Sequence, residues 1–153
     1  MHQPFDILLV EGNPADVEIT MEAFRRSHKG NRVFVCRDGE EALDFLFHRG
    51  KFARAGSAPR PDLISLDLNL PKKNGTEVLD QVKTDLQMED IPVVAVTTSD
   101  RDEDVSRCYK FGANRYLTKP VQFDDCLKLV EDIQRYWLQV SKLPPKGKSS
   151  ASL

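Results

Sequence analysis

Four polar residues stand at the ends of short apolar runs, and their types suit one kind of chemistry. Glu11 follows FDILLV, Asp67 follows DLISL, Thr97 follows IPVVAV and Lys119 follows RYLT. If these runs are neighbouring parallel strands about 4.8 Å apart, the side chains at their carboxyl ends converge on one small ion or phosphoryl group. The predicted site then combines two acids, a hydroxyl and an ammonium.

This combination suits the transfer of a phosphoryl group to a carboxylate. Asp67 would attack a phosphorus centre surrounded by negative oxygens, so cations must neutralise the charge. Lys119 is one candidate cation, and Mg²⁺ is another because it binds one or two carboxylates and retains waters and phosphate oxygens. The Thr97 hydroxyl could donate to a phosphoryl oxygen. Taken singly, each residue has an ordinary explanation, such as capping a helix or a turn.

The elements that must position these residues follow from apolar patterning. Short apolar, β-branched runs alternate with segments of helical period, which is typical of repeated βα units around a parallel sheet. Most of the runs are continuously apolar, as strands covered on both faces must be. Strands are predicted over residues 5–10, 32–36, 62–66, 91–96 and 115–117.

The helices between these strands are predicted from apolar residues that recur three or four positions apart. The residues are Val17, Met21 and Phe24, then Ala42, Leu43 and Leu46, then Val78, Leu79, Val82 and Leu86, then Val105, Cys108 and Tyr109, and finally Phe123, Leu127, Val130, Ile133 and Trp137. The sequence therefore predicts an α/β fold with a helix after each strand.

Composition limits the class of protein. With 153 residues, 40% of them hydrophobic and 30% charged, the chain fits one domain with a full core. A net charge of -2 argues against general affinity for nucleic acid. No leader and no run of about 20 apolar residues is visible, which predicts a cytoplasmic protein without a membrane partner. The three cysteines lack C-x-x-C spacing, so neither a disulfide framework nor a zinc site is predicted.

Two segments lack the strand and helix patterns. Residues 49–61 (RGKFARAGSAPRP) are basic and rich in Gly, Ala and Pro, which predicts a long surface loop. Residues 141–153 carry the Pro, Lys, Ser and Gly bias of a flexible end. The predicted organisation is one domain over residues 1–140 and a flexible tail over residues 141–153. Output must then come through protein contacts.

Four motifs in order carry a specific resemblance to a known family. They are LLVEGN at 8–13, LDLNLP at 66–71, VTT at 96–98 and KP at 119–120. From about residue 5 to residue 133, the chain resembles a bacterial response-regulator receiver domain. The resemblance implies a flavodoxin-like, doubly wound, five-stranded parallel sheet of order 2-1-3-4-5 with helices on both faces. It also implies that a sensor histidine kinase supplies the phosphoryl group.

The resemblance assigns roles to the acids and the metal. It implies that Asp67 is the phosphoacceptor, that Glu11 is the first member of the acidic pair, and that Asn69 lends its backbone carbonyl to Mg²⁺. Such a domain is not an enzyme, because it promotes only its own phosphorylation and dephosphorylation.

The resemblance also assigns the residues that respond to phosphorylation. It implies that Thr97 is the switch hydroxyl, Tyr116 the aromatic rotamer switch, and Lys119 the conserved cation. The Lys119–Pro120 peptide is expected to be cis, as in such domains, although cis X-Pro bonds are a minority choice.

A narrower resemblance concerns the partner. The long loop at 49–61, the letters NPAD at 13–16 and the lack of an output domain look most like the small receivers that partner bacterial phytochrome kinases. This implies a bacteriophytochrome as one candidate kinase. It also implies a homodimer, for which the final helix with Tyr136 and Trp137 is the expected interface.

Position 12 departs from the family pattern. The acidic pair should read Glu-Asp or Asp-Asp, but its second residue is Gly12. The missing carboxylate is the one that binds the metal most directly in this family, so Mg²⁺ binding is expected to be weakened. Glu11 and Asp67 remain. Asp16 lies one turn further on and is interpreted mainly as a first-turn acid that complements the helix dipole.

Three functions remain open. In a phosphoacceptor switch, charge at Asp67 draws Thr97 inward and shifts Tyr116. Alternatively, because of Gly12, the chain is an interaction module that binds its kinase without accepting phosphate. The third function is a flavodoxin-like cofactor binder or hydrolase on the same topology. It requires a phosphate-cradling Gly-rich loop or a nucleophile elbow, and EGNPAD is neither.

Overall fold

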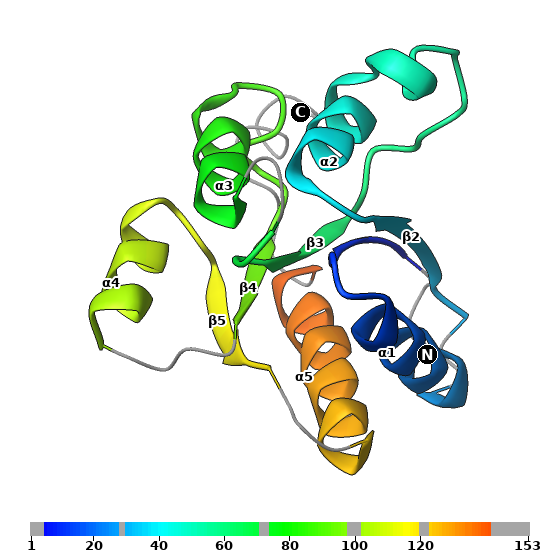
Figure 1. Ribbon diagram of the computed structural model, residues 1–153, viewed down its shortest axis with the longest axis vertical. Coiled ribbons are helices and arrows are strands. Elements are labelled where there is room, and N and C mark those ends of the chain that lie inside the picture. Colours follow the sequence, from blue (N-terminus) through cyan, green and yellow to red (C-terminus); the bar gives the residue numbers. More distant parts are fainter. Residues whose placement is uncertain (1–4, 28–29, 71–73, 98–101, 120–122, 142–153) are drawn as a thin grey trace.

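Five parallel strands form one sheet at the centre of the molecule. The computed structural model describes residues 5–27, 30–70, 74–97, 102–119 and 123–141 (Figure 1). The strand order is β2-β1-β3-β4-β5, and every neighbouring pair is parallel. This confirms the predicted fold class and strand order. The strands are β1 (Asp6–Val10), β2 (Arg32–Cys36), β3 (Leu63–Asp67), β4 (Val93–Thr97) and β5 (Arg115–Thr118).

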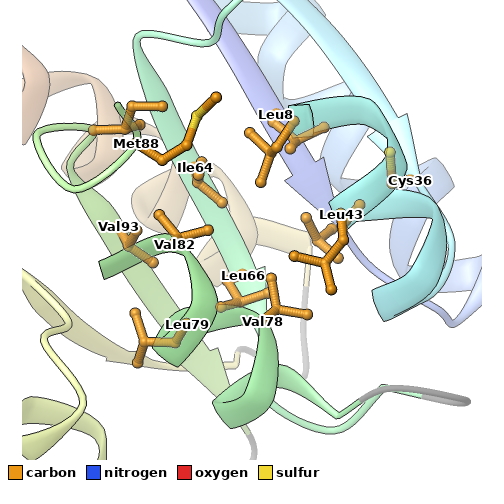
Figure 2. Packing of buried hydrophobic residues seen from close by; sticks show 14 of the residues in the cluster. Leu8, Cys36, Leu43, Ile64, Leu66, Val78, Leu79, Val82, Met88 and Val93 are labelled. Atoms are coloured by element: carbon orange, nitrogen blue, oxygen red, sulfur yellow. The ribbon is translucent and has the colours of Figure 1, made fainter. Parts of the chain in front are cut away.

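Helices cover both faces of this sheet. Side chains alternate along each strand, so Ile7 packs with the α1 and α5 side while Leu8 packs with the α2, α3 and α4 side. Figure 2 shows Leu66 of β3 against Val78 and Leu79 of α3 in the larger of these clusters. The helices are α1 (Pro14–Ser27), α2 (Gly39–Phe47), η1 (Gly50–Phe52, a 3-10 turn), α3 (Gly75–Thr84), α4 (Asp102–Lys110) and α5 (Phe123–Ser141).

The two central strands end one residue later than predicted. Asp67 pairs in register with Val96, and Thr97 pairs with Thr118, so the acid and the hydroxyl are the last residues of their strands. The backbone ladder continues through these positions because pairing uses main-chain groups whatever the side chain. At its start, β4 is shorter than predicted, because the strand begins only after Pro92, which lacks an N–H group.

The third helix was predicted to reach Leu86, and this was wrong. Helix α3 ends at Thr84, and Leu86 is 85% exposed. The carboxylate of Asp85 accepts hydrogen bonds from the backbone N–H groups of Gln87 and Met88, at 2.8 and 3.1 Å. This local bonding competes with the helix, as Asp commonly does. Met88 takes the buried position instead.

Residues 49–61 lie mostly at the surface, as predicted, but they are also fastened to the domain. The segment contains η1, and the ring of Phe52 packs edge-on against Phe45 with centroids 5.1 Å apart. His48 Nε2 lies 2.9 Å from the carbonyl of Ala58, which is buried. The guanidinium of Arg60 donates to the carbonyl of Gln87 at 3.1 Å. The insertion is therefore an ordered part of the α2 side.

The predictions for membrane spans, cysteines and the tail have different outcomes. Within the described ranges, no helix is long and apolar enough to cross a membrane. Cys36, Cys108 and Cys126 are buried and free, so no disulfide joins them. Residues 142–153, most of the predicted tail, lie outside the described part of the chain.

Candidate functional site

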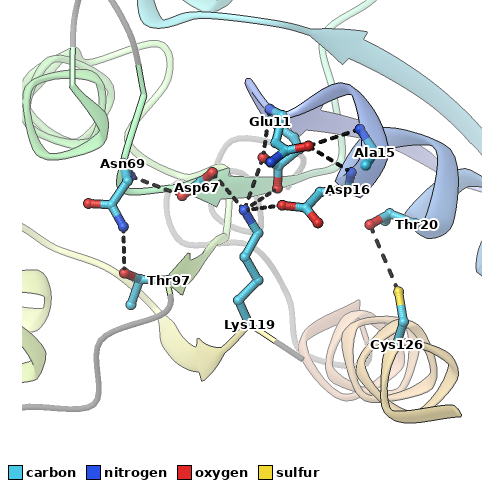
Figure 3. A network of polar contacts seen from close by, with 10 residues as sticks. Glu11, Ala15, Asp16, Thr20, Asp67, Asn69, Thr97, Lys119 and Cys126 are labelled. Atoms are coloured by element: carbon cyan, nitrogen blue, oxygen red, sulfur yellow. Dashed lines mark hydrogen bonds and ion pairs between the residues drawn. The ribbon is translucent and has the colours of Figure 1, made fainter. Parts of the chain in front are cut away.

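The strand ends bring the predicted polar residues together at one edge of the sheet (Figure 3). Glu11 follows β1, Asp67 ends β3, Thr97 ends β4 and Lys119 follows β5. Only 3–5% of Glu11, Asp67 and Thr97 is exposed. Buried polar groups of this kind are costly unless they are paired. The contacts that pair them therefore define the site.

The ammonium of Lys119 joins the acids. Its Nζ lies 3.0 Å from Glu11 Oε1, 3.1 Å from Asp67 Oδ2 and 2.8 Å from Asp16 Oδ2. Burial alone would lower the pKa of Lys119, but its contacts with Asp16, Glu11 and Asp67 raise that pKa above the usual value. Lys119 is therefore a charged ammonium at neutral pH and neutralises part of the acidic group.

Asp16 also belongs to this group, although the sequence predicted mainly that it complements the helix dipole. It lies in the first turn of α1, as the helix-dipole interpretation requires. Its carboxylate also binds Lys119, which the sequence interpretation did not foresee. The position of Asp16 in the sequence could have indicated this contact, because the first turn of the helix that follows a strand lies at the same edge of the sheet as the end of that strand.

Asn69 links the candidate acceptor to the candidate switch hydroxyl. Its backbone N–H donates to Asp67 Oδ1 at 2.9 Å, and its side-chain amide donates to Thr97 Oγ1 at 3.1 Å. The resemblance to receiver domains implied a role only for the backbone carbonyl of Asn69. The two hydrogen bonds therefore give Asn69 an additional structural role. They hold Asp67 and Thr97 in fixed orientations relative to each other.

Glu11 carries an unusual protonation equilibrium. Burial, together with the nearby Asp67 carboxylate, raises the pKa of Glu11 to about 7, although Lys119 and the N–H of Asn13 favour its charged form. A carboxyl group with this pKa is partly protonated at neutral pH. A second cation at this edge would convert it to the carboxylate.

The raised pKa gives a testable dependence of stability on pH. The folded protein binds the Glu11 proton more tightly than the unfolded chain, whose pKa lies near 4.5. The free energy of unfolding of the metal-free protein is therefore expected to fall, by about 2 kcal/mol, as the pH rises from 4.5 to 7. Urea denaturation at pH 5 and pH 8 measures this fall. This fall in stability should be largely absent from Glu11→Gln. An equal fall in the wild type and the variant would contradict the raised pKa of Glu11.

The donor set fits a small cation with few protein ligands. Glu11 and Asp67 lie within 3.1 Å of the same Lys119 nitrogen, so both carboxylates face one point. Gly12 adds no ligand, and among the described residues no group of three His, Cys, Asp or Glu residues is arranged to hold a metal. Two carboxylates with waters and phosphate oxygens satisfy Mg²⁺. The residues therefore fit a weak divalent site.

The remaining predicted residues pack against the hydrophobic clusters or lie outside the described part of the chain. Tyr116 of β5 is half-buried against the cluster under α2, α3 and α4. Its role as a rotamer switch stays a prediction. Tyr136 packs against the cluster under α1 and α5. Pro120, and with it the predicted cis peptide, lies outside the described residues, as does the side chain of Trp137.

Comparisons with known proteins show which proteins this chain is similar to. Residues 7–131 match the family model of the response regulator receiver domain. The chain is 44% identical to the probable methanogenesis regulatory protein FilR2 of Methanothrix harundinacea, over 92% of this chain and 88% of that protein. It is 41% identical to the response regulator Rcp1 of Synechocystis sp., over 92% of this chain and 94% of Rcp1.

Two solved structures are similar to the whole fold. The phosphorylated cyanobacterial phytochrome response regulator RcpA superposes with a TM-score of 0.82 at 39% identity, covering 95% of this chain and all of RcpA. The Mn²⁺-bound form of Rcp1 gives a TM-score of 0.81 at 41% identity, covering 92% of this chain and 99% of that structure. The similarity therefore extends over almost the whole length of these proteins.

Proposed function

The chain belongs to the response regulator receiver domain family, and from this premise we propose that Asp67 accepts a phosphoryl group from a sensor histidine kinase. Receiver domains of response regulators act in two-component signalling. The family match favours this function over a cofactor binder or hydrolase. Beyond promoting its own phosphorylation and dephosphorylation, the chain acts through protein contacts.

The observation that carries the proposal is the position of Asp67 between a cation and a backbone hydrogen-bond donor. Asp67 Oδ2 lies 3.1 Å from Lys119 Nζ, and Oδ1 accepts from the N–H of Asn69. In the transfer, an Asp67 oxygen forms a bond to phosphorus while the bond from phosphorus to the kinase histidine breaks. Lys119 stabilises the negative oxygens of the phosphoryl group, which is the main demand of this reaction.

A divalent cation is part of the proposal. When bound, it would neutralise phosphoryl oxygens. Glu11, Asp67 and the carbonyl of Asn69 would hold it, with Mg²⁺ as the expected ion. The Mn²⁺-bound form of the relative Rcp1 supports a divalent cation here. Glu11 must lose its proton to serve as a ligand, so binding should tighten as the pH rises through about 7.

Partner, assembly and location are also proposed. Relatives described as phytochrome response regulators support a bacteriophytochrome as the kinase. We propose a homodimer through α5, a domain over residues 1–140 and a flexible tail over residues 141–153. The three free, buried cysteines suit a reducing compartment, which supports a cytoplasmic location.

A second function is favoured by one specific observation. Position 12 is Gly12, and Lys119 already neutralises the acids that the metal would need. In this alternative the chain keeps the receiver fold and binds its kinase, but it accepts no phosphate. It would then be an interaction module held in its unphosphorylated form.

Intact mass after incubation with a small phosphodonor and Mg²⁺ tests the two functions. The wild type is expected to gain one phosphoryl group, and Asp67→Asn is expected to gain none because the nucleophilic oxygen is lost. Asp80→Asn is the matched control, since Asp80 is an exposed acid on α3. If the wild type stays unmodified while still binding its kinase, the interaction module is the correct function.

A further inference from the structure

Asp16 makes the shortest contact of the Lys119 ammonium. Figure 3 shows its carboxylate reaching Lys119 from α1, on a different element from Glu11 and Asp67. The distance is 2.8 Å, against 3.0 Å to Glu11 and 3.1 Å to Asp67. An ammonium has three N–H donors, so each can be directed at one of these carboxylates. Asp16 therefore completes the bonding of the ammonium.

The backbone at Asp16 is fixed relative to the site. The side chain of Asn13 accepts hydrogen bonds from the N–H groups of Ala15 and Asp16, at 2.9 and 3.3 Å. The N–H of Asn13 in turn donates to Glu11 Oε2 at 3.1 Å. Helix α1 thus starts at a defined place beside Glu11. Because the side chain of Asp16 is short, its carboxylate has little freedom to move once the backbone is fixed.

Lys119 needs such a partner because its side chain is long and flexible. Ordering a lysine side chain costs up to about 2 kcal/mol of rotamer entropy, which its contacts must offset. The contact with Asp16 is charge-assisted and only partly exposed, with 15% of the Lys119 side chain and 33% of the Asp16 side chain accessible. Gly12 has no side chain that could make a similar contact.

We propose that Asp16 is a positioning residue that holds the Lys119 ammonium beside Asp67. The proposal deepens the proposed function, because Lys119 is the cation that stabilises the phosphoryl group arriving at Asp67. Asp16 itself does not touch that group. It acts through Lys119 alone.

The first test compares rates of phosphorylation by a small phosphodonor. Asp16→Asn keeps the size of the side chain and an acceptor oxygen but removes the charge, and it is expected to slow phosphorylation about fivefold because the remaining hydrogen bond to Lys119 is weaker. The fall should appear in the rate at saturating phosphodonor rather than in KM. Glu18→Gln is the matched control, since Glu18 is an exposed acid on the same helix. An unchanged or faster rate in Asp16→Asn overturns the proposal.

A double-mutant cycle shows whether the effect passes through Lys119. In a Lys119→Gln background, Asp16→Asn should produce no further slowing. A fivefold loss that persists in this background would assign Asp16 a general structural role and overturn the proposal.

A second measurement does not depend on phosphorylation. Nitrogen-15 NMR of the lysine ammonium groups should show slow proton exchange at Lys119 in the wild type and faster exchange in Asp16→Asn, with Glu18→Gln unchanged. Equal exchange in the wild type and Asp16→Asn overturns the proposal. If the wild type accepts no phosphate, the proposed function fails, and this NMR comparison still decides the role of Asp16.

Discussion

Gly12→Asp is expected to bind Mg²⁺ at least about tenfold more tightly than the wild type, because a third carboxylate joins Glu11 and Asp67 at the metal. The variant should also gain its phosphoryl group faster from a small phosphodonor. The backbone can accept the change, since Gly12 is not among the residues with a positive φ. Calorimetric titration with Mg²⁺ measures the affinity directly.

Gly12→Asn is the matched control for this variant. It adds a side chain of nearly the same shape without the charge, so it separates the effect of a carboxylate from that of replacing glycine. In metal-free buffer, Gly12→Asp should be less stable than Gly12→Asn, because another acid is added beside Glu11 and Asp67. Mg²⁺ should reverse this order. Equal Mg²⁺ affinity in the two variants would show that position 12 does not contribute a ligand.

The sheet was predictable from sequence because its central strands are covered on both faces. All five residues of β3 and all five of β4 are buried, and apart from Ser65 and the terminal Asp67 and Thr97 these residues are apolar. The end of α3 was not predictable in the same way. Leu86 continues the helical period, and only the local hydrogen bonds of Asp85 stop the helix before it.

Apart from Asp16, the members of the site were predictable from the sequence, but the contacts between them were not. Side chains at parallel strand ends must share one edge, which places Asp67 near Thr97 and Lys119 whatever the loops do. The bonds of Asn69 to Asp67 and Thr97 depend on a loop conformation that no spacing rule specifies. The contact of Asp16 with Lys119 depends on where α1 starts, which Asn13 determines through its hydrogen bonds.

Gly75, at the start of α3, lies directly against the backbone of Asp67 and Leu68. A Cβ atom at this position would lie 2.4 Å from Leu68 Cα and 2.6 Å from the carbonyl oxygen of Asp67. Both neighbours are backbone atoms, and the N–H of Gly75 donates to the carbonyl of Leu68 at 3.0 Å. An added methyl group therefore cannot be accommodated unless α3 moves away from the end of β3.

Gly75→Ala is expected to lower the free energy of unfolding by about 3 kcal/mol, the upper end of the usual cost of overpacking. Urea denaturation followed by circular dichroism measures this loss. Phosphoryl uptake per folded molecule should also slow, because the backbone displaced by the methyl group carries Asp67. The two effects share one cause, the contact of Gly75 in α3 with the backbone of Asp67 and Leu68.

Gly56→Ala is the control that separates the steric clash at Gly75 from the backbone strain of replacing a glycine. Gly56 has a φ of +83° and nothing within 4 Å of an added Cβ, so its substitution strains the backbone without a clash. Its cost should be about 1 kcal/mol, with phosphoryl uptake unchanged. If Gly75→Ala were no more destabilising than Gly56→Ala, helix α3 could withdraw from β3 at little cost. The position of Asp67 would then depend on the pairing of β3 with β4 and on the bonds of Asp67 to Lys119 and Asn69, rather than on α3.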